Sequence, residues 1–156
     1  MALFIVALRL TGNIMTNSKS EYVENFFKNG LLEALTIGWQ RYGEVCDLSI
    51  QINKEIPWIL SNMVASNSEL ITYAIVKNQF ISERIKELLN PSINVDFSTR
   101  LEVLILVKNI IAGYRIDICY TLVYQNNLLA HLVPLLDSAN VYQHQRIFRE
   151  ALEVVQ

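Results

Sequence analysis

Three asparagines stand at one position of a repeated sequence pattern and offer the chemistry needed to bind a peptide. Asn13, Asn62 and Asn109 are separated by 49 and 47 residues. An asparagine amide carries two donors and an acceptor, enough to pair with the N–H and C=O groups of an extended peptide. Trp58 precedes Asn62 by four residues, so in a helix both side chains share one face. The amide could hold a peptide backbone while the indole packs the methylenes of a Lys or Arg side chain.

Two acidic residues lie close to this pattern and would select basic side chains. Glu55 and Glu102 each stand three residues before equivalent positions, which are occupied by Trp58 and Ile105. Residues three apart on a helix lie on nearly the same face. A carboxylate there could form a charge-assisted hydrogen bond with a Lys or Arg of the peptide. We therefore expect a groove that binds an extended basic peptide.

Helices must position these side chains, because apolar residues recur at steps of three and four along the chain. The clearest stretches cover residues 80–89 and 128–136. Segments rich in Asn, Ser, Gly or Pro interrupt the pattern at residues 16–20, 42–43, 66–68, 90–92 and 137–140. No segment alternates with a period of two, as a half-buried strand would. The sequence predicts an all-α fold with short loops.

Three segments align with one another and indicate an internal repeat: residues 12–35, 61–85 and 108–132. In each, the asparagine is followed 17 or 18 residues later by the residue that opens the next apolar helix, namely Gly30, Gln79 or Asn127. Helical repeats of about 40–47 residues form the armadillo and HEAT class, in which neighbouring units bury one another's apolar faces. An amphipathic bundle without repeats is the alternative. Because Asn is a poor helix former, its return inside apolar helices favours the repeat.

Composition limits the classes of protein to which the chain can belong. Its 156 residues are 52% hydrophobic and 18% charged, with a formal net charge of −2. This apolar content fits one domain with a large core and argues against disorder. The net charge gives no sign of nucleic-acid binding. No apolar run is long enough to cross a membrane, and residues 1–10 lack the features of a signal peptide.

The remaining residues contain no motif for catalysis or for a cofactor. Cys46 and Cys119 lie 73 residues apart without a CxxC, which predicts neither a disulfide framework nor a zinc site. His131 and His144 have no Cys or Asp at metal spacing, and no Ser or Cys sits in a recognisable nucleophile motif. We expect no enzyme activity, no metal and no cofactor. Trp39 is expected to pack at a helix junction rather than in a site.

The residues around the asparagines resemble a known family, the armadillo-repeat nuclear import adaptors (importin-α). Trp58 and Asn62 are similar to the family's Trp-x-x-x-Asn signature on the third helix of a repeat. Residues 7–16 resemble the variant repeat in which Arg replaces Trp. This resemblance assigns Arg9 and Asn13 to the variant pair.

Two later segments, residues 55–69 and 99–113, resemble the repeats that follow in the family. Those repeats build the family's minor site for nuclear localisation signals. By this resemblance, Glu55 and Glu102 match acidic residues of that site, and Ser61 matches a small polar residue. The implied peptide-binding residues are Arg9, Asn13, Glu55, Trp58, Ser61, Asn62, Glu102, Ile105 and Asn109.

The chain departs from the family pattern at two positions. Ile105, four residues before Asn109, stands where the family has an aromatic residue. A basic side chain bound beside Ile105 would therefore have no cation–π contact there. Pro57 lacks a backbone N–H and is best tolerated in the first turn of a helix. We therefore expect the helix that carries Trp58 to begin near Glu55 or Ile56.

The resemblance implies a right-handed superhelical solenoid of about three armadillo repeats, with residues 1–156 forming a single array truncated at both ends. The implied function is that of a nuclear import adaptor in cytoplasm and nucleus, whose partners are basic nuclear localisation signals and transport receptors. Neither nucleic acid nor membrane is an implied partner. A general armadillo scaffold without import activity is the alternative. Uncapped repeat ends would also favour self-association.

Overall fold

The computed structural model describes residues 2–44, 48–113, 116–136 and 145–155, and every regular element in these ranges is helical. The first six helices are α1 (Ala2–Asn17), α2 (Ser20–Lys28), α3 (Leu31–Tyr42), α4 (Ser49–Val64), α5 (Glu69–Lys77) and α6 (Gln79–Leu89). The later elements are α7 (Phe97–Ala112), α8 (Ile116–Tyr120), the π-helix η1 (Thr121–Gln125), α9 (Leu129–Leu132), the 3-10 helix η2 (Val133–Leu136) and α11 (Gln145–Val155). The predicted all-α fold class is confirmed for this part of the chain.

The predicted breaks at residues 66–68 and 90–92 fall between helices, and those at 16–20 and 42–43 overlap helix ends, whereas residues 137–140 lie outside the described residues. Local side chains explain several of the boundaries. Asn78 caps α6 by accepting a hydrogen bond from the Ile81 N–H at 3.1 Å. Asp96 caps α7 by accepting one from the Thr99 N–H at 3.2 Å.

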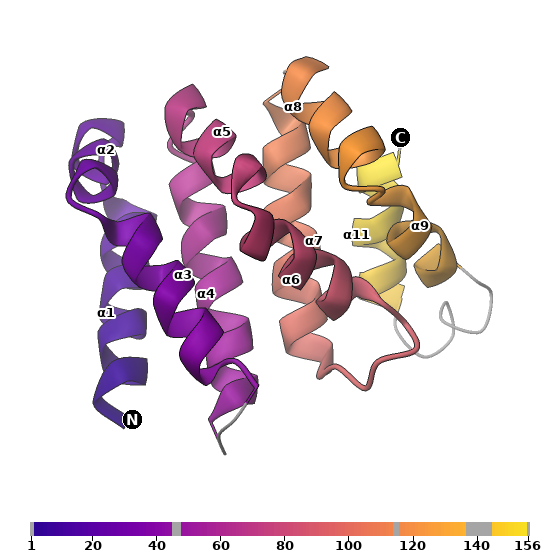
Figure 1. Ribbon diagram of the computed structural model, residues 1–156, viewed down its shortest axis with the longest axis horizontal. Coiled ribbons are helices and arrows are strands. Elements are labelled where there is room, and N and C mark those ends of the chain that lie inside the picture. The colour runs from indigo at the N-terminus through magenta and orange to yellow at the C-terminus, as the bar shows by residue number, and fades with distance from the viewer. Residues whose placement is uncertain (1, 45–47, 114–115, 137–144, 156) are drawn as a thin grey trace.

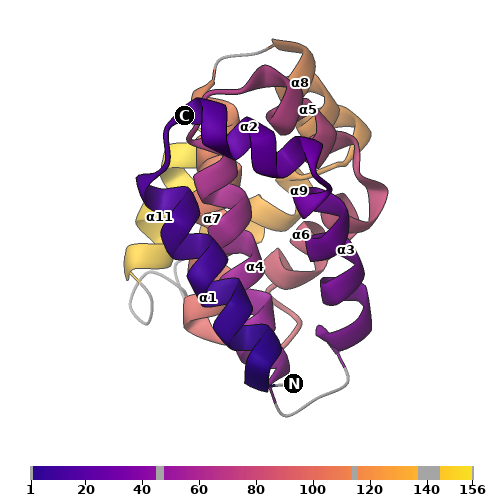
Figure 2. The ribbon, with the colours of Figure 1, turned by 90° about the vertical axis from the view of Figure 1, so that its left-hand side faces the viewer.

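The helices form two layers, which the end view separates clearly (Figures 1 and 2). In the layer that we call the first layer, α1, α4, α7 and α11 lie side by side, each packed against the next. The second layer contains α3, α6 and α9, and the short helices α2, α5 and α8 lie in a row along one edge of the two layers, at the top in Figure 1. The chain thus passes three times through a long helix, a short one and a return helix or return segment, beginning at α1, α4 and α7.

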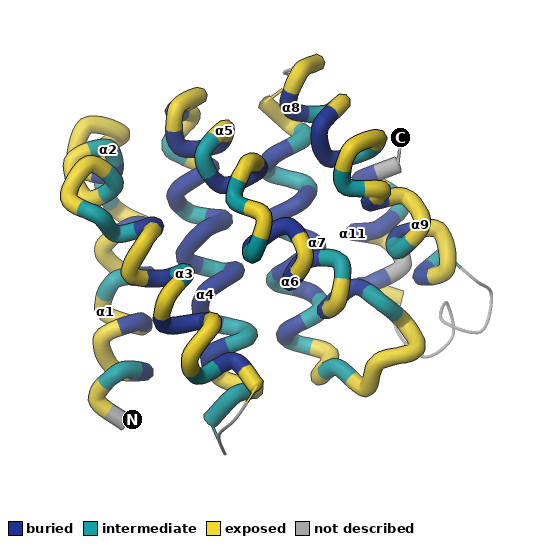
Figure 3. The backbone as a smooth tube through the Cα atoms, viewed as in Figure 1, coloured by how far each residue is buried: buried dark blue, intermediate teal, exposed yellow. Residues whose placement is uncertain are grey.

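The core is centred on α4, which lies between α1 and α7 in the first layer (Figure 3). Its fully buried apolar side chains are Ile52, Ile56, Ile59, Leu60 and Met63. Burying one such side chain is favourable by roughly 1.5–3 kcal/mol. With neighbours on both sides and the second layer behind it, α4 has one open side, and this side carries the candidate site.

A one-residue insertion in the third sequence copy coincides with the π-helix η1. The spacing from Asn109 to Asn127 is one residue longer than the equivalent spacings in the first two copies. In η1 the Asn126 N–H donates to the Thr121 carbonyl at 2.9 Å, five residues back. Such a wider turn accommodates an extra residue without ending the helix. The register of the return segment is therefore restored by the start of α9.

The expected start of the Trp58 helix near Glu55 or Ile56 is wrong, because α4 begins at Ser49 and contains Pro57 in its interior. A proline inside a helix costs about 3 kcal/mol. Pro57 is itself buried, and the packing of α4 between α1 and α7 offsets this cost. Glu55 consequently lies on the same continuous helix as Trp58.

A hydrogen-bonded cluster fixes α4 relative to α3 and α6. Trp39 is 1% exposed, and its Nε1 donates to Asn53 Oδ1 at 2.7 Å. The Asn53 amide donates in turn to the Gly43 carbonyl at 2.8 Å. Buried Arg84 donates to the same carbonyl at 3.0 Å. Trp39 lies inside α3 and packs in the core against α4 and α6, outside the candidate site.

Candidate peptide-binding face

The predicted site residues lie on three adjacent helices of the first layer. They are Arg9 and Asn13 on α1, Glu55, Trp58, Ser61 and Asn62 on α4, and Glu102, Ile105 and Asn109 on α7. Their contacts cross two interfaces, which we call the first junction (α1 with α4) and the second junction (α4 with α7).

At the first junction, Arg9 on α1 forms an ion pair with Glu55 on α4. The Nε of Arg9 donates to Oε1 of Glu55 at 2.9 Å. The Arg9 side chain is 57% exposed, whereas that of Glu55 is 11% exposed. An arginine therefore reaches over the surface of the layer to a nearly buried carboxylate on the next helix.

Trp58 packs across the first junction onto the backbone of Gly12. A Cβ at Gly12 would lie 2.0 Å from Cζ3 of Trp58, far inside a normal contact distance. The indole is half-buried against the core and leaves part of its surface to solvent. Sequence reasoning selected Trp58 but missed Gly12, whose signal is a glycine in the middle of an apolar helix.

Two of the three site asparagines form hydrogen bonds to the preceding helix of the layer. The Asn62 amide donates to Thr16 Oγ1 at 2.9 Å, and the Asn109 amide donates to Ser61 Oγ at 2.8 Å. Asn13 is exposed on α1. Since an amide has two donors and an acceptor, these bonds orient the side chains without using their full hydrogen-bonding capacity.

The second junction differs because its acid has no such arginine. Glu102 is half-buried, and burial raises the pKa of its carboxyl group. The positive charges of Lys54 and Arg146 lower this pKa, and the Glu55 carboxylate raises it. Within the described part of the chain, no cation forms an ion pair with Glu102 within 4.0 Å.

The repeat register explains this difference between the two acids. Glu102 is the equivalent of Glu55, 47 residues later, and Trp58 is the equivalent of Arg9, 49 residues later. Where the first junction has an arginine beside its acid, the second junction has an indole. Half-buried Ile105 follows Glu102 by three residues and takes the place that Trp58 has on α4.

On the far side of α7, ion pairs close the contact with α11. Lys108 bonds to Glu150, and its Nζ lies 3.2 Å from Glu153 Oε2. The hydrogen bond to Glu150 is the main cause that raises the pKa of Lys108. This lysine is therefore engaged with α11.

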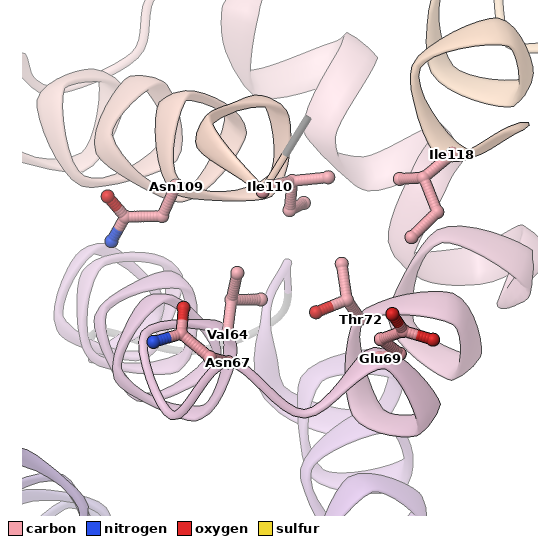
Figure 4. A pocket seen from close by; sticks show the side chains of 8 residues that line it. Val64, Asn67, Glu69, Thr72, Asn109, Ile110 and Ile118 are labelled. Atoms are coloured by element: carbon pink, nitrogen blue, oxygen red, sulfur yellow. The ribbon is translucent and has the colours of Figure 1, made fainter. Parts of the chain in front are cut away.

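A small pocket opens beside Asn109, at the end of the face nearest α5 (Figure 4). Its volume is about 140 Å³. The lining residues are Val64, Asn67, Glu69, Thr72, Asn109, Ile110, Gly113 and Ile118. Ligand pockets for whole small molecules usually measure about 300–1,000 Å³, so this one fits a single side chain.

No family model matches the sequence, and neither a curated protein nor a solved structure shows significant similarity to it. Among the described helices, none is both long and apolar enough to span a membrane. The described residues likewise contain no group of three His, Cys, Asp or Glu side chains arranged to hold a metal ion.

Proposed function

We propose that the chain is an armadillo-repeat protein of the nuclear import adaptor type, which binds an extended Lys/Arg-rich localisation signal across α1, α4 and α7. The repeated order of long, short and return helices supports armadillo units that stack as a right-handed solenoid. The constant positions of Asn13, Asn62 and Asn109 along that stack provide one amide per unit.

The observation that carries this proposal is the half-buried Glu102 carboxylate without an ion pair in the described chain, at the junction where Trp58 replaces an arginine. At the first junction the Arg9 guanidinium meets Glu55 at 2.9 Å, which demonstrates the geometry that such an acid favours. A peptide Lys or Arg would take the equivalent place at the second junction. Its methylenes would pack on Trp58 while its cation neutralises Glu102.

The asparagine amides would hold the peptide backbone. Cross-helix hydrogen bonds fix Asn62 and Asn109 in orientation, so little side-chain entropy is lost when a peptide binds. Asn13 would extend the row onto α1. The small pocket beside Asn109 would receive one side chain at the end of the bound segment.

The proposal includes the partners and location of such an adaptor. Its partners are nuclear localisation signals of cargo proteins and the transport receptors that carry the complex between cytoplasm and nucleus. The proposed function involves no catalytic step and no cofactor, and its partners include neither nucleic acid nor a membrane. The chain's role is to hold the signal through groups that face the groove.

One observation favours the second candidate, a general armadillo scaffold without import activity. Glu55 is paired with Arg9, and the Asn62 and Asn109 amides are bonded to Thr16 and Ser61. These pairs join neighbouring helices and would stabilise the fold even without a bound peptide. A scaffold of this kind would bind another segment of protein with no preference for Lys or Arg.

Calorimetric titration with a Lys/Arg-rich signal peptide and its Glu-substituted counterpart separates the two candidates. The adaptor hypothesis predicts saturable, salt-sensitive binding of the basic peptide, weaker binding by Glu102→Gln, and no binding of the acidic peptide. Glu33→Gln on α3 is the matched control, because Glu33 is exposed on the second layer. Equal binding of both peptides, or of neither, would reject the import-type function.

A further inference from the structure

An open groove runs between α5 and α8, two short helices that pack side by side along the edge of the two layers (Figure 1). We call it the edge groove. Two hollows of about 790 and 400 Å³ make up its length, and Tyr73 and Asp117 line both of them. The larger hollow also reaches Lys77 at the end of α5, whereas the smaller one reaches Glu69 at its start. The edge groove therefore follows α5 for about 12 Å, at about 1.5 Å per residue.

Two tyrosines at one repeat position form the walls of the edge groove. Tyr73 on α5 and Tyr120 on α8 are 47 residues apart, the same spacing as that between Asn62 and Asn109. Their side chains are 49% and 54% exposed, and both line the larger hollow. Buried Thr121 lines it as well. Each of the two helices thus presents an aromatic side chain to the edge groove.

The preceding pair of short helices, α2 and α5, is closed by polar contacts at the equivalent place. The position of Tyr73 is occupied by Glu24, 49 residues earlier. Glu24 Oε1 accepts a hydrogen bond from Ser68 Oγ at 2.9 Å, which joins α2 to the start of α5. Ser20 also donates to the Ser66 carbonyl at 3.0 Å. The exposed tyrosines are therefore a feature of α5 and α8, rather than of every pair of short helices.

Side chains that can donate hydrogen bonds line one end of the edge groove. Lys77 Nζ lies 3.5 Å from Gln125 Oε1 and 5.6 Å from the centre of the Tyr73 ring. The lysine thus reaches from α5 to η1. A lysine carries three donors, and glutamine amides and tyrosine hydroxyls donate as well. An occupant that is rich in carbonyl acceptors and poor in N–H donors matches this end.

Acidic side chains lie at the opposite end of the edge groove. Glu69 and Asp117 line the smaller hollow beside Leu70, and both are exposed. A carboxylate forms charge-assisted hydrogen bonds with Lys or Arg. The charge at this end therefore favours an occupant with a basic residue.

We propose that the edge groove binds a proline-rich segment of another protein in the polyproline II conformation, with a basic residue at the end nearest Glu69 and Asp117. A proline offers a carbonyl acceptor but no N–H, as the donor-rich end requires. Aromatic-lined grooves are the usual sites for such segments. At about 3.1 Å per residue, four residues in this conformation span the 12 Å or so of the edge groove.

A helix or a β-strand would fit the edge groove less well. Packed helices have axes about 8–10 Å apart, whereas a helix with its side chains is about 10–12 Å wide, so a bound helix would not enter between Tyr73 and Tyr120. A β-strand needs free backbone N–H and C=O groups beside it, and helices use these groups internally. A polyproline II segment needs no such edge, because its backbone makes no regular hydrogen bonds.

Fluorescence anisotropy with labelled peptides tests this proposal on the full chain. The probe carries one arginine followed by a Pro-x-x-Pro sequence, and its control has every proline replaced by alanine at the same net charge. The proline peptide should bind saturably, and the alanine peptide at least about tenfold more weakly, because it is not preorganised. Replacing the peptide's arginine by glutamate should also weaken binding.

Variants of the protein locate the site. Tyr73→Ala and Tyr120→Ala should each weaken binding of the proline peptide at least about tenfold, as expected for aromatic residues that anchor an interface. Tyr22→Ala is the matched control, because Tyr22 is a tyrosine of similar exposure, 56%, on α2 and outside the edge groove. Circular dichroism establishes that each variant is folded before affinities are compared.

The edge groove is separate from the candidate peptide-binding face on α1, α4 and α7, so an excess of a proline-free Lys/Arg-rich peptide should not displace the proline peptide. Displacement would overturn the proposal. So would no binding of the proline peptide at millimolar protein, or equal affinities for Tyr73→Ala and Tyr22→Ala. Equal or tighter binding of the alanine peptide would also reject it, in favour of a helical occupant.

Discussion

The same repeat positions make different contacts at the first and second junctions of the first layer. At the first junction, Arg9 neutralises Glu55 and the Trp58 ring covers Gly12. At the second junction, Trp58 stands in the position of Arg9, and the half-buried Glu102 has no ion pair in the described chain. The first junction pairs its acid within the fold, and the proposed function assigns the acid of the second junction to a cation of the peptide.

Under the proposed function, a change of one side chain at a repeat position converts a structural contact into a binding site. Replacing an arginine by an indole removes the internal cation and adds an apolar wall. Glu102 keeps the register position of Glu55 but has no arginine beside it, so burial disfavours its ionised form and raises its pKa. The selectivity for a basic peptide is therefore expected to arise at the second junction.

The largest effect is expected from Gly12→Ala, which would break the first junction. Alanine is favoured over glycine in a helix by about 1 kcal/mol, but a Cβ here would lie 2.0 Å from the Trp58 ring. Displacing the ring should lower the free energy of unfolding by about 1–3 kcal/mol and also weaken peptide binding. Chemical denaturation measures the first effect. Gly113→Ala, where the added Cβ would lie 3.6 Å from the Ile110 carbonyl oxygen, should be nearly neutral.

Trp58→Ala should weaken binding of a basic peptide by about 1–3 kcal/mol, the range for an aromatic residue that anchors an interface. The half-buried ring also packs against the core, so some loss of stability accompanies the loss of affinity. Trp58→Phe keeps a flat apolar wall and should lose less of both. If Trp58→Ala lowers the melting temperature but leaves the peptide affinity unchanged, the ring serves packing alone.

Glu102→Gln should weaken binding by about 1 kcal/mol at low salt, and less at high salt, because the lost interaction is between charges. Burial raises the pKa of Glu102, so wild-type affinity should fall on acidification at a higher pH than for an ordinary glutamate. Above that pKa the ionised group opposes folding, and Glu102→Gln should therefore raise the melting temperature at neutral pH. Titrations at several pH values should show no such step in the variant.

The smallest effect is expected from placing a tryptophan at position 105, so that the second junction has the Trp–Gly contact of the first. Ser61 is the equivalent of Gly12, and it accepts a hydrogen bond from Asn109 at 2.8 Å. Ile105→Trp alone should crowd Ser61, whereas Ile105→Trp combined with Ser61→Gly should make room for the ring. Because Ser61→Gly also removes the hydroxyl that orients Asn109, the double variant should bind a basic peptide tighter than the single variant by less than about 1 kcal/mol. A single variant that binds as tightly as the double one would show that the glycine is not required.

The helical fold and the repeated units were predictable because they depend on local patterns. Apolar spacing marked the helices, and the positions of Asn13, Asn62 and Asn109 gave the register of the units. The interior position of Pro57 was not predictable from local rules, because packing from α1 and α7 outweighs the cost of the lost hydrogen bond. The π-helix was not predicted, although the third unit has one extra residue.

The contacts of the candidate site were less predictable than its members. Sequence spacing assigned Trp58 and Asn62 to one face, but it did not reveal Gly12 or Thr16 as their partners on α1. Those partners lie 46 residues away, and the axial offset between two packed helices decides which side chains meet. The pairing of Arg9 with Glu55 was missed for the same reason.

The most direct test of the central claim follows the two indole N–H signals of the wild-type protein by NMR during titration with a Lys/Arg-rich peptide. The chain has two tryptophans, so Trp39, buried away from the candidate face, serves as an internal reference. The account predicts a progressive, saturable shift of the Trp58 signal, an unchanged Trp39 signal, and no shift with the Glu-substituted peptide. An unmoved Trp58 signal at saturating basic peptide, or equal shifts with both peptides, would contradict it.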